Sequence, residues 1–144
     1  MLRAKGRSTR ARAIVAGPPM VIGIGLDLVE TERVVRLLER YGDRFVRKLM
    51  DPGEAGALPE AVPERARRLA LAVAAKEAAS KALGTGWSHG VRWRDVVVST
   101  EPGTAIRLAG RAAEVAGERG SSGRTRVRLE IAGEHAIGEV WLLS

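Results

Sequence analysis

Hydrophobic and polar positions alternate along the chain with two different periods, which predict a mixture of strands and helices. Apolar runs with strand character lie at residues 21–28, 91–100, 104–108, 125–131 and 135–143. Helical spacing of the apolar positions is found at residues 31–41, 42–49, 64–83 and 109–119. Because these elements are mixed without a regular βαβ alternation, the pattern predicts an α+β fold that ends in an antiparallel pair of strands.

The end of the long predicted helix has the residue types of a binding site for a phosphate-rich ligand. Glu77 and Lys81 are four residues apart and share one helix face, and the helix runs into the glycine turn Gly84-Thr85-Gly86. A carboxylate, a cation and free backbone donors along one edge suit a metal-bound ligand that carries phosphates. The simpler alternative is a surface ion pair worth about 0.3–0.5 kcal/mol, with Gly84 only ending the helix.

Asp27 interrupts the first predicted strand near its end, where its neighbours are apolar. An acidic side chain in such a strand is costly unless it is paired or binds a metal. Mg²⁺ prefers one or two carboxylates together with phosphate oxygens and water, which makes Asp27 a candidate ligand. The alternative is a capping or turn carboxylate. Gly23 and Gly25 in the same strand predict that another part of the backbone approaches closely.

Composition narrows the class of protein further. The 144 residues suffice for one domain with its own core. The chain has no cysteine, which excludes disulfides and a cysteine nucleophile, and its two histidines, His89 and His135, cannot form a histidine-rich zinc site. No apolar run approaches the ~18 residues of a membrane span, so we expect no membrane partner and a cytoplasmic location.

The positive charge of the chain is concentrated near its start. Five basic residues and no acids lie within residues 1–20, which leaves a formal charge of +2 out of +7 for the remainder. We therefore expect a basic, disordered extension over residues 1–19 and a folded domain over residues 20–144. The extension either precedes a true start at Met20 or is an arm for nucleic acid or acidic protein. A nucleic-acid-binding module is the weakest interpretation of the whole chain, because stacking aromatic residues and a recognised motif are missing.

Three blocks of sequence carry a resemblance to a known family. They are Gly23–Asp27 followed by Arg33, then Phe45–Glu54, and finally Ala74–Gly86 continuing into Gly90–Val96. In the order and spacing of these blocks, from about residue 20 onward, the chain resembles the holo-acyl-carrier-protein synthases, the small single-domain group of 4'-phosphopantetheinyl transferases. The third block is highly specific for this group.

The resemblance implies a fold, an activity and a set of partners. Family members transfer the 4'-phosphopantetheine arm of coenzyme A to a serine of an apo acyl carrier protein and release adenosine 3',5'-bisphosphate. The implied fold packs an antiparallel sheet against the long alanine-rich helix, and the implied assembly is a homotrimer with active sites between subunits. The alternative is a family member with lost or altered chemistry that binds coenzyme A or a carrier protein. The carrier belongs to fatty-acid synthesis or to a specialised polyketide or peptide pathway.

The resemblance also assigns roles to the candidate site residues. By position, Asp27 and Glu77 match two carboxylates that hold Mg²⁺ against the pyrophosphate, and Lys81 matches a lysine that contacts the coenzyme A phosphates. These three residues form the implied catalytic set. The turn Gly84-Thr85-Gly86 matches the segment that lines the nucleotide site.

The helix predicted over residues 31–41 is implied as the docking surface for the acidic carrier protein. Arg33 matches a basic family residue on that helix, and Arg36 and Arg40 extend the same surface. Opposite charges on two partners steer and orient their encounter, which is the role that such a basic helix would have.

The chain departs from the family pattern at a few positions. Ile131 stands where family members usually carry a histidine near bound coenzyme A, and His135 follows four residues later. We interpret His135 as an ordinary polar side chain; the alternative is partial substitution for the missing histidine. Ala72 and Val73 replace the arginine and the aromatic residue that usually precede the third block. Trp87 and Trp93 flank the glycine turn, where we expect core packing and keep nucleotide shielding as the alternative.

Overall fold

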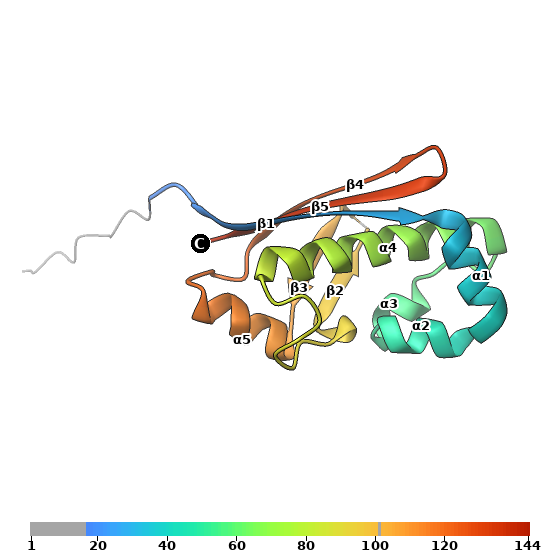
Figure 1. The fold of residues 1–144 in the computed structure, drawn as a ribbon, viewed down its shortest axis with the longest axis horizontal. Helices are drawn as coiled ribbons and strands as arrows, with labels where there is room; N and C mark the ends of the chain where they lie inside the picture. Colours follow the sequence, from blue (N-terminus) through green and yellow to red (C-terminus); the bar gives the residue numbers. More distant parts are fainter. Residues whose placement is uncertain (1–16, 101) are drawn as a thin grey trace, which may run out of the picture.

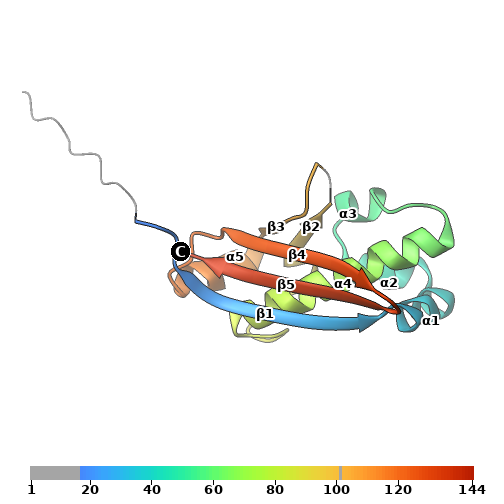
Figure 2. The same ribbon diagram turned by 90° about the horizontal axis from the view of Figure 1, so that it is seen from above.

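A three-stranded antiparallel sheet and a long helix form the two main layers of the fold, seen from two sides in Figures 1 and 2. The computed structural model describes residues 17–100 and 102–144. The strands β1 (Val21–Glu30), β5 (His135–Leu143) and β4 (Thr125–Ala132) lie side by side in the order β1-β5-β4. The 22-residue helix α4 (Val62–Leu83) runs along one face of this sheet.

The predicted α+β fold and the terminal antiparallel pair are confirmed. The expectation of a disordered extension lies almost entirely outside the described residues.

Smaller elements surround the two ends of α4 (Figure 1). The helices α1 (Thr31–Tyr41), α2 (Asp43–Leu49) and α3 (Pro52–Gly56) lie at one end, and α5 (Gly110–Glu118) lies toward the other. The strands β2 (Val96–Ser99) and β3 (Ala105–Leu108) form a separate two-stranded antiparallel sheet. No helix in the described part of the chain is both long enough and apolar enough to cross a membrane.

The prediction of a single strand over residues 91–100 is wrong for the first half of that range. The structure has a short 3-10 turn at Trp93–Asp95, and β2 begins only at Val96. Asp95 explains the difference, because its carboxylate accepts hydrogen bonds at 3.0 Å from both the backbone N–H and the guanidinium of Arg92. A side chain that binds the backbone three residues earlier closes a turn and so competes with an extended ladder.

Glycine and alanine set the distance between α4 and the sheet. A Cβ atom built at Gly25 of β1 would lie 1.7 Å from the carbonyl oxygen of Ala78, and one built at Gly138 of β5 would lie 2.6 Å from the carbonyl of Ala74. Such distances leave no space for a side chain, so the backbones of the strands and the helix are in direct contact. The close approach predicted from the strand glycines is therefore confirmed. The helix residues in this contact are four apart and form one row, Ala74, Ala78 and Ala82.

A buried ion pair closes the open edge of β2. Lys76 is fully buried, and its Nζ atom lies 2.8 Å from Oε1 of Glu54. Lys76 also donates hydrogen bonds to the carbonyl oxygens of Trp93, at 3.1 Å, and Val96, while Glu54 accepts one from the backbone N–H of Val98 at 2.8 Å. Because β3 pairs with only one edge of β2, these two side chains take the place of a second neighbouring strand.

Candidate active site

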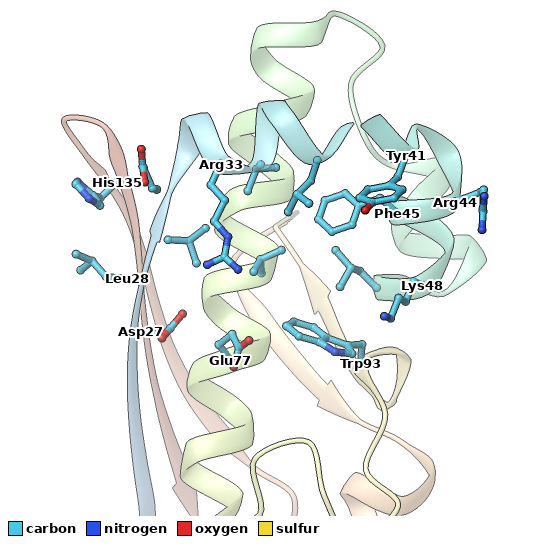
Figure 3. A pocket seen from close by; sticks show the side chains of 16 residues that line it. Asp27, Leu28, Arg33, Tyr41, Arg44, Phe45, Lys48, Glu77, Trp93 and His135 are labelled. Atoms are coloured by element: carbon cyan, nitrogen blue, oxygen red, sulfur yellow. The ribbon is translucent and has the colours of Figure 1, made fainter. Parts of the chain in front are cut away.

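A cavity of about 930 Å³ lies between the end of β1, the helices α1 and α2, and the middle of α4. Apolar and aromatic side chains of α1 and α2 form much of its wall (Figure 3). Its lining also brings charged side chains of α4 together with those of three consecutive elements, β1, α1 and α2; these side chains are Asp27, Glu30, Arg33, Arg44, Lys48 and Glu77. A cavity with an apolar wall and a few charged groups has the character of a small-molecule site.

Asp27 and Glu77 are both placed at this cavity, one by β1 and the other by α4, and they lie beside each other in Figure 3. Asp27 follows Gly25 by two positions and therefore points to the same face of β1, toward α4. Its Oδ1 atom lies 2.8 Å from Nζ of Lys81, which also donates a hydrogen bond to the carbonyl of Leu26 at 3.0 Å. Lys81 is half exposed, at 51%, so this ion pair is accessible to solvent.

Glu77 is held from the other side by a tryptophan. The indole Nε1 of Trp87 donates a hydrogen bond to Oε2 of Glu77 at 3.1 Å. The Trp87 ring stacks on the ring of Trp93, with 4.0 Å between centroids and 20° between planes, and Trp93 also lines the cavity. The two indoles therefore pack on each other next to the candidate site.

The two carboxylates fit a hard divalent cation such as Mg²⁺. Lys81 occupies Oδ1 of Asp27 and Trp87 occupies Oε2 of Glu77, so Oδ2 and Oε1 accept no hydrogen bond from the residues that the structure describes. Mg²⁺ uses few protein carboxylates and completes its shell with water and phosphate oxygens. Across residues 17–100 and 102–144, no group of three or more histidine, aspartate or glutamate side chains forms a metal-binding cluster. The free oxygens of Asp27 and Glu77 make these two residues the candidate ligands for such a cation.

The glycine turn lies one helical turn beyond Lys81 and is not part of the cavity lining. Gly84 ends α4 in the left-handed region with a φ of 78°, a conformation that favours glycine. It also leaves room for Arg119, whose guanidinium donates to the carbonyl of Ala82 at 2.9 Å and lies 2.6 Å from a Cβ built at Gly84. Thr85 donates its hydroxyl to the carbonyl of Gly86 at 3.0 Å.

The three arginines predicted to dock the carrier protein have different surroundings. Arg33 lines the cavity, and its side chain extends toward Asp27 and Glu77 in Figure 3. Arg36 pairs with Glu32 on the outside of α1 at 3.3 Å. Arg40 lies over the ring of Tyr41 at 5.2 Å.

Sequence reasoning did not single out two cations of the cavity, Arg44 and Lys48 of α2. Both belong to a short helix rich in charges, where a basic residue that faces a ligand and one that faces water look alike. His135 lines the cavity, whereas Ile131 is exposed on β4 and lies outside the lining.

Residues 23–137 match the family described as the 4'-phosphopantetheinyl transferase superfamily. The holo-[acyl-carrier-protein] synthase of Alkalilimnicola ehrlichii is 42% identical over 129 residues, covering 87% of this chain and 98% of that protein. The holo-[acyl-carrier-protein] synthase of Solibacter usitatus is 49% identical over 80 residues, covering 56% of this chain and 63% of that protein, slightly less than two thirds of its length.

Solved structures show the same fold. The holo-[acyl-carrier-protein] synthase of Neisseria meningitidis superposes with a TM-score of 0.69 at 29% identity, covering 85% of this chain and 98% of that one. The Helicobacter pylori holo-[acyl-carrier-protein] synthase in complex with coenzyme A superposes with a TM-score of 0.70 at 22% identity, covering 83% and 98% of the two chains.

Two carboxylates and several basic side chains around one cavity suit a ligand that carries phosphates together with a divalent cation. The chain belongs to the 4'-phosphopantetheinyl transferase superfamily and, within it, to the holo-[acyl-carrier-protein] synthases. The predicted family and the prediction of an enzyme are confirmed, while the roles of individual residues stay predictions.

Proposed function

We propose that this enzyme transfers the 4'-phosphopantetheine arm of coenzyme A to a serine of an apo acyl carrier protein, in a Mg²⁺-dependent reaction that releases adenosine 3',5'-bisphosphate. The main support is the meeting of Asp27 and Glu77, fifty residues apart in the chain, at one cavity with a free oxygen on each. A protein of the same fold, the Helicobacter pylori synthase, binds coenzyme A.

The proposed catalysis consists mainly of stabilising the negative charge that develops on the pyrophosphate of coenzyme A. The carrier serine attacks the β-phosphate while adenosine bisphosphate leaves, so negative charge spreads over the phosphate oxygens. A bound Mg²⁺ supplies positive charge that stabilises this distribution. Lys81 adds a second cation through its ion pair with Asp27, and Arg33, which lines the cavity, adds a third. The serine proton passes to water or to a carboxylate of the cavity.

The ligand is proposed to extend along α4 toward the glycine turn. Glu77, Lys81 and Gly84 follow one another by about one helical turn each, so an extended phosphate ligand on this face reaches all three. Gly84-Thr85-Gly86 would line the nucleotide, and Arg33, Arg36 and Arg40 would meet the carrier protein.

Incubation with coenzyme A, Mg²⁺ and an apo acyl carrier protein tests the proposal, with the added arm detected by intact-protein mass. Labelling of the carrier supports the transferase. Tight binding of coenzyme A without labelling of several carriers favours the alternative, a member with altered chemistry, which the isoleucine at position 131 would help to explain. Carriers of fatty-acid synthesis and of specialised pathways, tested side by side, identify the pathway.

We also propose that three copies of the chain associate through the outer face of the three-stranded sheet. Alternate residues of β1 turn away from α4, and three of them expose large apolar side chains to 56–57% of their maximum, namely Ile24, Leu26 and Leu28. A contiguous apolar surface of this kind is uncommon on a monomer and marks an interface.

Replacing Leu26 by glutamate is expected to convert the trimer to monomers, because it places a charge at the centre of this apolar row. Size-exclusion chromatography with light scattering gives the mass of both forms. Val62→Glu is the matched control, because Val62 is equally exposed, at 62%, but lies at the start of α4. A wild-type chain that is monomeric at micromolar concentration would contradict the proposed assembly.

A further inference from the structure

We infer that Trp87 is a positioning residue that orients Glu77 toward the cavity. The inference rests on the proposed function, in which Glu77 is a ligand for a divalent cation. Trp87 would not touch the cation; it would act through the carboxylate that its indole holds. Nothing in the sequence pattern pointed to this role, since Trp87 is separated from Glu77 by the end of α4 and a glycine turn.

The hydrogen bond between the two residues has a defined direction. An indole nitrogen can only donate and an ionised carboxylate can only accept. The 3.1 Å contact therefore fixes Oε2 of Glu77 against the tryptophan, and Oε1 remains for a ligand in the cavity. A free glutamate side chain presents either oxygen in many orientations, so this contact selects one of them.

The indole is itself held in place from α4. Its ring stacks on Trp93, and the backbone carbonyl of Trp93 accepts a hydrogen bond at 3.1 Å from the buried Lys76. Lys76 and Glu77 are neighbours on the same helix. The two tryptophans thus connect Lys76 to Glu77 through a chain of contacts. A shift of either ring would change the position of the Glu77 carboxylate.

The loop that carries Trp87 has further attachments. The backbone N–H of Gly86 donates to the carbonyl of Ser80 at 3.1 Å. The guanidinium of Arg111 on α5 donates to the carbonyl of His89 at 3.0 Å. Trp87 therefore lies between two anchored points, which is what a side chain needs if it is to orient another one.

Removing a side chain that donates a hydrogen bond to a metal ligand usually weakens metal affinity by about 10–100-fold. Trp87→Phe keeps an aromatic ring for the stack on Trp93 and removes only the N–H donor. We expect its affinity for Mn²⁺, measured by electron paramagnetic resonance on the full chain, to be about 10-fold weaker than that of wild type. In the transfer assay, the Mg²⁺ concentration for half-maximal rate should rise by a similar factor, with little change in the KM for coenzyme A.

Trp141→Phe is the matched control. The indole of Trp141 also donates to a glutamate, Glu139, at 2.9 Å, but this pair lies on β5 and is not part of the cavity. Because Trp141 lies opposite Ile24 on the outer face of the sheet, light scattering first establishes that Trp141→Phe keeps the wild-type mass. Its Mn²⁺ affinity should then lie within twofold of wild type. Equal Mn²⁺ affinity in Trp87→Phe and wild type would overturn the inference.

NMR of the indole N–H groups tests the inference on the wild-type chain, so this test does not depend on whether Trp87→Phe folds. The chain has three indole N–H signals, and Trp93→Phe and Trp141→Phe assign two of them, so the third belongs to Trp87. We expect that third signal to move when Mg²⁺ is added and to stay fixed in Glu77→Gln.

If wild type neither binds Mn²⁺ nor labels a carrier, the proposed function fails. If wild type does both and the Trp87 signal ignores Mg²⁺, only the positioning role fails.

Discussion

Replacing Glu77 by glutamine is expected to slow phosphopantetheine transfer by about 10²–10³-fold, the loss that follows removal of one well-placed group that stabilises transition-state charge. The amide has the size of the carboxylate and still accepts a hydrogen bond from Trp87, but it has lost the charge that attracts a divalent cation. The fold should be retained, because Glu77 faces the cavity and makes no other side-chain contact of the hydrogen-bonding kind among the described residues.

Initial rates by intact-protein mass, together with thermal unfolding, measure this effect. Glu114→Gln is the control, because Glu114 is an exposed residue of α5 that pairs with Arg111 at 3.0 Å. The control should transfer at the wild-type rate. A Glu77→Gln variant that keeps the wild-type rate at saturating Mg²⁺ would show that this carboxylate is not part of the reaction.

Replacing Lys76 by methionine is expected to lower the free energy of unfolding by about 3–5 kcal/mol, the usual cost of leaving one member of a buried ion pair alone. The change would leave the Glu54 carboxylate without its cation and the carbonyls of Trp93 and Val96 without a donor. Urea unfolding measures the difference. Lys81→Met removes a pair of the same 2.8 Å length at a half-exposed site and should cost only about 0–1 kcal/mol. A loss below about 1 kcal/mol for Lys76→Met would contradict the buried-pair interpretation.

The stability contributed by Lys76 should also depend on pH. Burial lowers the pKa of Lys76 below its ordinary value of 10.5, and the attraction of Glu54 only partly offsets this effect. Between the lowered pKa and pH 10.5 the unfolded chain binds more protons than the folded one, so this group makes stability rise with pH. Lys76→Met lacks that rise, and the gap in stability between the two proteins should widen as the pH increases through this range.

The sequence predicted best those features that depend on neighbours within one element. Gly23 and Gly25 predicted a close backbone contact because a strand glycine has no side chain to prevent it. The helix around Glu77 and Lys81 followed from spacing alone. The start of β2 was misplaced because the Asp95 turn competes with the valine-rich pattern, and propensity does not weigh a side-chain hydrogen bond against a ladder.

The sequence predicted poorly those features that need contacts between elements. The adjacent charges of Lys76 and Glu77 suggest two solvent-exposed side chains. The complete burial of Lys76 against Glu54 of another helix was therefore not expected. The stack of Trp87 on Trp93 depends on a loop folding back beside α4. Asp27 and Glu77 were brought together by family resemblance, because periodicity within β1 and within α4 says nothing about which positions of the two elements meet.

If Asp27 and Glu77 hold a cation as proposed, the contact between Gly25 and Ala78 determines which cations fit between them. Asp27 lies two residues after Gly25, and Glu77 directly precedes Ala78, so the gap between their carboxylates is set where two backbones already touch. Closely packed backbone has little freedom to move apart. Ca²⁺ needs longer bonds, of about 2.3–2.6 Å, and more ligands than Mg²⁺, whose bonds are about 2.0–2.1 Å. Discrimination against the larger ion would therefore be encoded in a glycine that touches no ligand.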